Sequence, residues 1–202
     1  MSITNKEEIM RQAAVFFFRK GYESTNLSEI AQAVKIQKPG LFFHFKNKED
    51  LYHKVIDKYL IDVQSPKQKF GKIETVSLQE FIDFYLQKVE VAMQLVAQII
   101  QSGEKTAIQY FFSSLECCSR YDRCAQALYD FNKEELDIWE SVIQHARQTG
   151  EIRTDVNPRA LAENFRYAFL GMSYMLSTNG GVKIDELKDL FYNIYSNVKL
   201  TK

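Results

Sequence analysis

Residues 26–51 read NLSEIAQAVKIQKPGLFFHFKNKEDL, and this stretch decides the fold of the chain. Asn26 can begin a helix by accepting an unpaired backbone N–H, and Glu29, three residues later, can reach back to complete a capping box. Pro39 fits the first turn of a second helix, where a missing N–H costs nothing. A capped helix, a connection of a few residues and another short helix have the spacing of a helix-turn-helix.

The start of the second short helix has the chemistry of a groove-reading surface. In a helix-turn-helix the second helix enters the DNA major groove with its first residues towards the bases. The residues at that place are polar or small: Gln37, Lys38, Pro39 and Gly40. Positive side chains gather around the same helix: Lys35, Lys38, Lys46 and Lys48, with His44 among them. The motif therefore predicts a DNA contact made by a local basic surface.

The composition is that of an ordinary globular protein of one domain or two small ones. The 202 residues are 46% hydrophobic, with 26 basic against 26 acidic side chains. Zero net charge argues against a general polyanion binder. The N-terminus lacks the apolar core of a signal peptide and no apolar run reaches membrane-spanning length, so we expect a cytoplasmic protein without a membrane partner.

The sequence contains no recognisable catalytic or metal-binding pattern. We find no Ser–His–Asp order, no glycine-rich phosphate loop and no paired carboxylates that can be placed together. His53 and His145 have no partner at metal-ligand spacing. We therefore expect neither an enzyme, nor a cofactor, nor a metal site.

Helical periodicity extends through the whole chain and predicts an all-α protein. Apolar residues recur at helical spacing, and we find no alternating strand pattern, hairpin signal or repeat. We expect a helix-turn-helix domain over residues 1–50 and a helical bundle over residues 51–202, with a helix over 48–64 connecting them. The most polar break in the chain covers residues 65–72. Later capping signals predict helices that begin at Ser77, Asn132 and Asn157.

The three cysteines suggest a reducing compartment because they are few and odd in number. If residues 117–124 belong to one helix, Cys117 and Cys124 are about 10 Å apart by helical rise, too far for an unstrained bridge. We therefore expect the cysteines, including Cys118, to be packing residues, with thiol sensing as the alternative.

A set of residues at fixed spacings resembles the N-terminal domain of TetR-family transcriptional repressors. The set covers about the first quarter of the chain: Gly21, Tyr22, Thr25, Asn26, Ile30 and Ala31, then Ile36, Leu41, Phe42, His44, Phe45, Lys48 and Leu51. The resemblance implies a homodimer in which the last two helices of each subunit form a four-helix interface. It also implies a bundle that binds a small effector.

Carried over position by position, the resemblance implies a set of DNA-binding residues. Asn26 and Lys48 would contact phosphates, and Phe43 and His44 would lie against the DNA strand. The remaining residues would face bases or backbone: Gln37, Lys38 and Gly40.

Two residues depart from the family pattern. Lys35 replaces a usual glycine of the turn, at a cost of about 1 kcal/mol if its φ is positive. Phe42 replaces a usual tyrosine and lacks a hydroxyl that could bond a phosphate.

The bundle contains aromatic and apolar residues with two possible roles each. Candidates to line an effector cavity are Tyr85, Tyr110, Phe111, Trp139, Phe165 and Phe169; the alternative is a filled core. Candidates for the dimer interface are Phe169, Gly171, Met172, Leu187, Leu190, Phe191, Ile194 and Tyr195. The alternative is that these stripes close the core of the subunit itself.

Together these observations predict a ligand-responsive, dimeric, DNA-binding transcriptional regulator. We expect a repressor that a small apolar or aromatic effector releases from a palindromic operator. The alternative is a helical ligand-binding or protein-interaction module whose helix-turn-helix does not bind DNA. Salt dependence separates the two, because neutralised phosphates make log affinity fall steeply with log salt.

Overall fold

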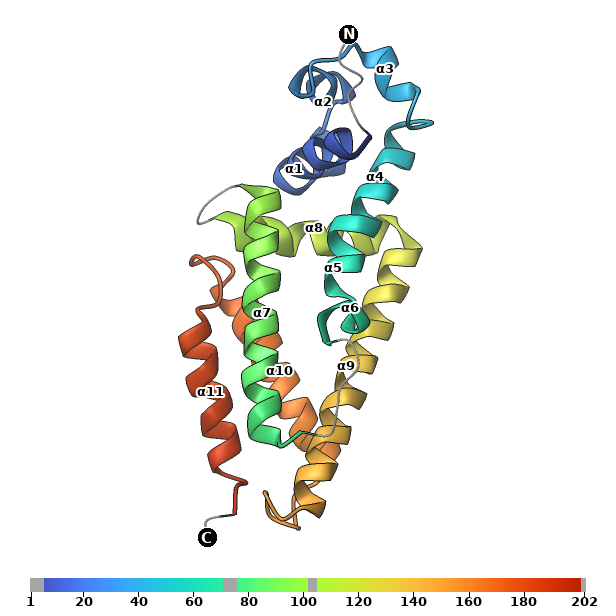
Figure 1. Ribbon diagram of the computed structural model, residues 1–202. Helices are drawn as coiled ribbons and strands as arrows, with labels where there is room; N and C mark the ends of the chain where they lie inside the picture. The colour runs from blue at the N-terminus through green and yellow to red at the C-terminus, as the bar shows by residue number, and fades with distance from the viewer. Residues whose placement is uncertain (1–5, 71–75, 102–104, 201–202) are drawn as a thin grey trace. The chain divides into compact units, whose positions relative to one another are not determined.

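The computed structural model describes residues 6–70, 76–101 and 105–200, and helices are their regular structure (Figure 1). The only pairing of extended backbone in these ranges is a single bridge between Ile152 and Lys199. The predicted all-α fold is confirmed. The polar break predicted at 65–72 includes a short helix, α6 (Pro66–Phe70), and its last two residues lie outside the described ranges.

The chain forms two compact units. Unit 1 comprises residues 1–63 and 94–127, and unit 2 comprises residues 64–93 and 128–202. The helices α7 (Leu78–Ile100) and α9 (Asp122–Gln148) therefore each contribute one end to each unit. The functional boundary between residues 50 and 51 stays a prediction.

Unit 1 contains the helix-turn-helix. Its helices are α1 (Lys6–Ser24), α2 (Leu27–Ala33), α3 (Lys38–Phe42), α4 (Lys48–Ile56), the π-helix η1 (Asp57–Ile61), α5 (Asp62–Gln64, whose last residue falls in unit 2) and α8 (Thr106–Arg120). Phe17 of α1 meets Tyr52 of α4 edge-on, with ring centroids 5.0 Å apart. Ser113 of α8 donates to the Phe18 carbonyl at 3.3 Å, so α8 packs on α1.

Local capping signals position the helix-turn-helix as predicted. The Asn26 side chain accepts the Ser28 N–H at 2.9 Å, and the Asn26 N–H donates to Glu29 at 3.3 Å. At the start of α4, Asn47 accepts the Asp50 N–H at 2.8 Å. In the turn between α2 and α3, Lys35 has φ 58°, the left-handed conformation that favours glycine.

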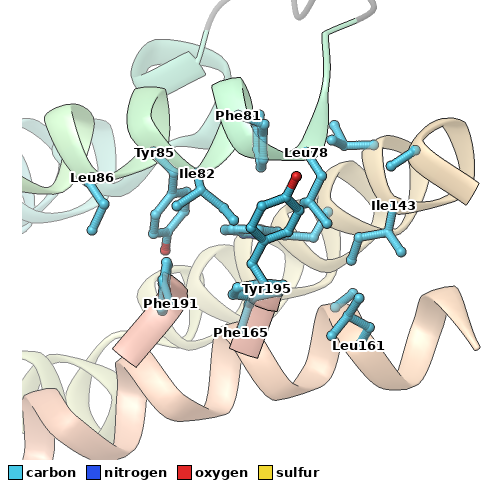
Figure 2. Packing of buried hydrophobic residues seen from close by; sticks show 14 of the residues in the cluster. Leu78, Phe81, Ile82, Tyr85, Leu86, Ile143, Leu161, Phe165, Phe191 and Tyr195 are labelled. Carbon is cyan, nitrogen blue, oxygen red and sulfur yellow. The ribbon is translucent and has the colours of Figure 1, made fainter. Parts of the chain in front are cut away.

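Unit 2 is built around an aromatic core. Its helices are α6, α7, α9, α10 (Pro158–Leu176) and α11 (Ile184–Ser196). Side chains from α7, α9, α10 and α11 point into one cluster (Figure 2). Trp139 stacks on Phe165 with centroids 4.6 Å apart and meets Phe81 edge-on at 4.8 Å. Such ring pairs add to the stability that their buried area provides.

The helix start predicted at Asn132 is wrong, because α9 continues through this position without a break. The side chain of Asn132 accepts a hydrogen bond from Arg166 at 2.9 Å. Glu135, the expected partner in the capping box, instead pairs with Lys69 at 2.9 Å and with Arg166 at 2.5 Å. Asn132 and Glu135, which have the spacing of a capping box, therefore bind residues distant in sequence instead of capping a helix.

The expectation that Cys117 and Cys124 cannot bridge is also wrong. Helix α8 ends at Tyr121, whose extended backbone (φ −133°, ψ 95°) separates it from α9. The corner brings the two Cα atoms within 6.2 Å, and the cysteines form a disulfide. Cys118 has a free thiol.

Candidate nucleic-acid interface

Helix α3 is anchored on one side and free on the other. Leu41 is buried and Phe45 is only 3% exposed, so both hold α3 and its following turn to unit 1. Phe43, between them in sequence, is 88% exposed. Burying such a ring against another surface is favourable, so its exposure marks a face that can receive a partner.

A depression at the start of α2 brings together three of the predicted DNA-binding residues. They are Asn26, which caps α2, Lys38 of α3 and Lys48 of α4. The whole lining is Glu23, Ser24, Thr25, Asn26, Leu27, Lys38 and Lys48. Two ammonium groups beside the first turn of a helix suit an anion such as a phosphate.

The other predicted contacts lie on α3 and the turn after it. Gln37 precedes α3 and makes no capping bond with its side chain, so its amide is available to a partner. A Cβ built on Gly40 would meet only the Ile36 side chain, at 3.4 Å, so the fold itself tolerates a methyl group there. The His44 ring lies 5.4 Å from the Phe43 ring, edge to face. The role of Gln37, Gly40, Phe43 and His44 as DNA contacts stays a prediction.

Tyr22 positions the ammonium group of Lys48. The Lys48 Nζ lies 4.4 Å from the Tyr22 ring centroid and donates to the Glu23 carbonyl at 3.3 Å. Burial raises the pKa of Tyr22, so its phenol is neutral at pH 7 and does not pair with the lysine as an anion. The Tyr22 N–H donates to the Glu116 carboxylate at 3.0 Å, so the end of α1 is bonded to α8.

The electrostatics favour an anion at this end of unit 1. Within the described residues, none of the four lysines around α3 has a carboxylate partner: Lys35, Lys38, Lys46 and Lys48. Two of the nearby acids are already paired, since Glu29 binds Lys20 at 2.7 Å and Asp50 binds Lys54 at 2.6 Å. These partners lower the pKa of each carboxyl group, so both stay ionised.

The structure brings four of the six effector-pocket candidates together. Tyr85, Trp139 and Phe165 are buried in the core of unit 2, and Phe169 packs at its edge, 6.1 Å from Tyr85. These rings fill the core by contacting one another. Tyr110 and Phe111 instead belong to α8 in unit 1.

A buried polar cluster lies beside these rings, and sequence reasoning did not identify it. Arg166 is 5% exposed and donates to the Tyr85 hydroxyl at 2.7 Å. Burial opposes its charge, but Tyr85 and Glu135 outweigh burial and raise the pKa of Arg166. The available signal was a cation within the apolar stripe of α10, directly after Phe165 and three residues before Phe169.

The dimer-interface candidates divide into three groups. Leu187, Phe191 and Tyr195 are buried in the core of their own subunit, so they are not available to another copy. Four residues are half-buried: Phe169, Met172, Leu190 and Ile194. Gly171 is exposed, and a Cβ built on it would meet nothing within 4 Å. Sequence reasoning missed its large exposed neighbours on α10: Tyr167, Leu170, Tyr174 and Met175.

The described ranges lack the features of a metal site and of a membrane span. These residues contain no group of three or more His, Cys, Asp or Glu side chains that could hold a metal ion. None of their helices is both long and apolar enough to cross a membrane.

Comparison with known proteins identifies the N-terminal part of the chain. Residues 9–55 match the family described as "Bacterial regulatory proteins, tetR family". The chain is 38% identical over 60 residues to the biofilm operon icaADBC HTH-type negative transcriptional regulator IcaR of Staphylococcus epidermidis. This match covers 28% of the chain and 32% of that protein.

The similarity extends more weakly beyond the first helices. The IcaR of Staphylococcus aureus strain Newman is 28% identical over 104 residues, 50% of the chain and 56% of that protein. The chain thus spans about a third and about half, respectively, of these two curated relatives. Both are regulators rather than enzymes.

A solved structure shares the fold over nearly the whole length. The regulatory protein TetR from Rhodobacter sphaeroides superposes with a TM-score of 0.61 at 19% identity, covering 95% of this chain and 97% of that one. The matched motif and the shared helical fold agree: residues 9–55 are similar to the tetR family of bacterial regulatory proteins, and 95% of the chain has the fold of a solved TetR regulator.

Proposed function

We propose that the protein is a DNA-binding transcriptional repressor that acts in the cytoplasm. The observation that carries the proposal is the free face of α3, with Phe43 exposed and unpaired lysines around it. This face has the charge and shape to enter a major groove. The IcaR relatives, described as negative transcriptional regulators, favour repression over activation.

The proposal includes a small-molecule effector that binds unit 2. An effector lowers DNA affinity only if it binds the DNA-free conformation more tightly than the DNA-bound one. Such coupling between sites is typically about 1–3 kcal/mol. The helical segment over residues 48–64 follows the helix-turn-helix and leads to the start of unit 2. It is therefore a candidate to transmit a conformational change from the effector to the DNA-binding helices.

The direct test is DNA binding with matched lysine variants. We expect the protein to bind a palindromic site next to its own gene, measured by fluorescence anisotropy over a range of salt. Lys38→Ala and Lys48→Ala should each weaken binding roughly tenfold and reduce the salt slope by about 1, because each removes one phosphate contact. Lys88→Ala, on α7 in unit 2, is the control and should bind like wild type.

Two results would contradict this assignment. Either folded Lys38→Ala and Lys48→Ala proteins bind DNA as tightly as wild type, or the wild-type affinity is insensitive to salt. The second result would favour an interaction module with an inactive helix-turn-helix.

We also propose that the protein binds its operator as a homodimer through the exposed face of α10. Tyr167, Leu170, Tyr174 and Met175 follow the helical repeat along one side, and Met175 is 71% exposed. Gly171 lies among them and allows a second helix to approach closely. A contiguous apolar stripe on a surface helix is the pattern of a protein interface.

Charge placed on this stripe should separate the subunits. We expect the double variant Leu170→Glu/Met175→Glu to sediment as a monomer at a concentration at which wild type sediments as a dimer. Its affinity for a palindromic site should fall at least tenfold, since both half-sites can no longer be held by one particle. Tyr129→Glu, at an exposed position on α9, should leave the dimer intact. A dimer that survives the double substitution would place the interface elsewhere.

A further inference from the structure

The polar cluster in unit 2 contains two cations and one carboxylate. Glu135 is 2% exposed and pairs with both Arg166 (2.5 Å) and Lys69 (2.9 Å), so these three groups together carry a formal charge of +1. Burying charge without full compensation is unfavourable. Lys69 is 22% exposed in its side chain, so water solvates part of the excess charge, and an added negative group at this edge would take the place of that water.

A buried donor beside the same cluster has no acceptor in the described part of the chain. Arg166 donates to the Tyr85 hydroxyl and to the Asn132 amide oxygen. Trp139, whose ring lies 5.0 Å from that of Tyr85, is buried, and its Nε1–H has no hydrogen-bond partner in the described part of the chain. An indole N–H can only donate, so an added acceptor is what would satisfy it.

One side of the cluster faces solvent. Lys69 is 22% exposed in its side chain, and Asn132 is exposed. A molecule that approached from this side would meet the Lys69 ammonium first. It would reach the Arg166 Nη2 by taking the place of the neutral Asn132 oxygen, because a carboxylate forms the stronger, charge-assisted bond with a guanidinium.

Aromatic side chains surround the polar groups. Phe70 of α6 stacks on Tyr85 with centroids 5.6 Å apart, and the Arg166 guanidinium lies 5.9 Å from the half-buried Phe169 ring. The buried rings already fill the core, so a ligand at this edge would have its charged group beside the cations and its body against the half-buried Phe169 ring. Sites for small organic molecules combine such an apolar lining with a few polar groups.

We infer that unit 2 binds a small organic acid with an apolar or aromatic body, and that Arg166 and Lys69 hold its acidic group. The inference rests on the proposed function, since the acid would be the effector of the regulator. It assigns a chemical class to the effector: a monocarboxylate or a similar anion, in preference to a neutral or cationic compound of the same shape.

The chain provides its own reporter for binding. Trp139 is the single tryptophan in the sequence, so tryptophan fluorescence, excited at a wavelength that tyrosine does not absorb, reports on the surroundings of this one ring. The probes are benzoate, phenylacetate and 4-phenylbutyrate, each paired with its amide and titrated against the full chain without DNA. We expect at least one acid to change the fluorescence saturably, with its amide binding at least tenfold more weakly.

Matched variants test the two cations. Arg166→Gln should abolish the response. Because that variant can fail to fold, Lys69→Met at the exposed edge is the second variant. It should lower the affinity for the acid at least fivefold. Lys67→Met, on the exposed side of the same helix α6, should leave the affinity unchanged.

Three results would overturn the inference: none of the acids binds, the amides bind as tightly as the acids, or Lys69→Met and Lys67→Met behave alike. Since the titration contains no DNA, its failure is distinct from failure of the proposed function. If the protein binds operator DNA but none of the acids, the proposed function stands and the proposed class of effector is wrong.

Discussion

Replacing Glu135 by alanine is expected to lower the free energy of unfolding by about 3–5 kcal/mol, because it leaves two cations near the core without their counter-ion. The carboxylate is the shared partner of Lys69 and Arg166, and it is almost completely buried. Lys69 can turn its ammonium group towards water, but Arg166 lies too deep to do so. The remaining cost falls mainly on the guanidinium.

A double variant tests this cause against simple loss of packing. In Glu135→Leu/Arg166→Met both charged partners are replaced by apolar side chains of similar volume. We expect it to be more stable than Glu135→Leu alone, since replacing a whole buried ion pair is often neutral or stabilising. Urea unfolding of wild type, Glu135→Leu, Arg166→Met and the double variant, followed by circular dichroism, gives the four free energies of the cycle.

Glu163→Ala is the surface control. Glu163 pairs with Arg159 at 3.5 Å on the exposed side of α10, and its loss should cost less than about 1 kcal/mol. If Glu135→Ala is no more destabilised than this control, the cluster is not a buried ionic centre. If the double variant is as unstable as Glu135→Leu, packing and not charge accounts for the loss.

The structure of the helix-turn-helix was largely predictable from sequence because contacts between residues close in sequence determine it. Asn26 with Glu29 and Asn47 with Asp50 are three residues apart, so the chain supplies both members of each cap wherever the helix lies. Phe45 continues the apolar pattern of Ile36 and Leu41, so the sequence itself favours it as the residue that anchors α3, and it is buried in the structure. The strained turn at Lys35 followed from family resemblance, not from local pattern.

The bundle was less predictable because its decisive contacts are long-range. Asn132 and Glu135 have the spacing of a cap, yet Arg166, more than thirty residues later, binds both. A stripe such as Leu187, Phe191 and Tyr195 indicates that a helix buries one face, but not whether its own subunit or a second copy covers that face. Only the packing of unit 2 assigns these three residues to the subunit's own core.

The disulfide was not predictable because no proline or glycine marks the corner between α8 and α9. The interruption occurs at Tyr121, whose ring stacks on His53 at 3.9 Å and whose hydroxyl donates to Asp57 at 3.2 Å. These contacts with α4 and η1 hold the corner in place from outside the segment. The helical rise between Cys117 and Cys124 therefore overestimates their separation.

Reducing the disulfide between Cys117 and Cys124 is expected to lower the free energy of unfolding by about 2.5 kcal/mol, the loop-closure term for a ring of this size. The effect should concentrate in unit 1, where residues next to the cysteines contact the helix-turn-helix. Glu116 accepts the Tyr22 N–H, and Arg123 pairs with Asp57 at 2.9 Å. Loosening the corner weakens these contacts, so amide hydrogen exchange should quicken in α4 more than in α11.

Matched cysteine variants distinguish the disulfide from buried thiols in general. Cys117→Ser should reproduce the loss seen with a phosphine reductant, and adding the reductant to this variant should have no further effect. Cys118→Ser should stay close to wild type: burial raises the pKa of the Cys118 thiol, which therefore remains protonated and unreactive near neutral pH. Thermal unfolding with and without reductant measures all three proteins. If reductant leaves the wild-type melting temperature unchanged, or if Cys118→Ser loses as much stability as Cys117→Ser, the corner is held by the stacking of Tyr121 on His53 and by the ion pair of Asp57, and the disulfide contributes nothing to its stability.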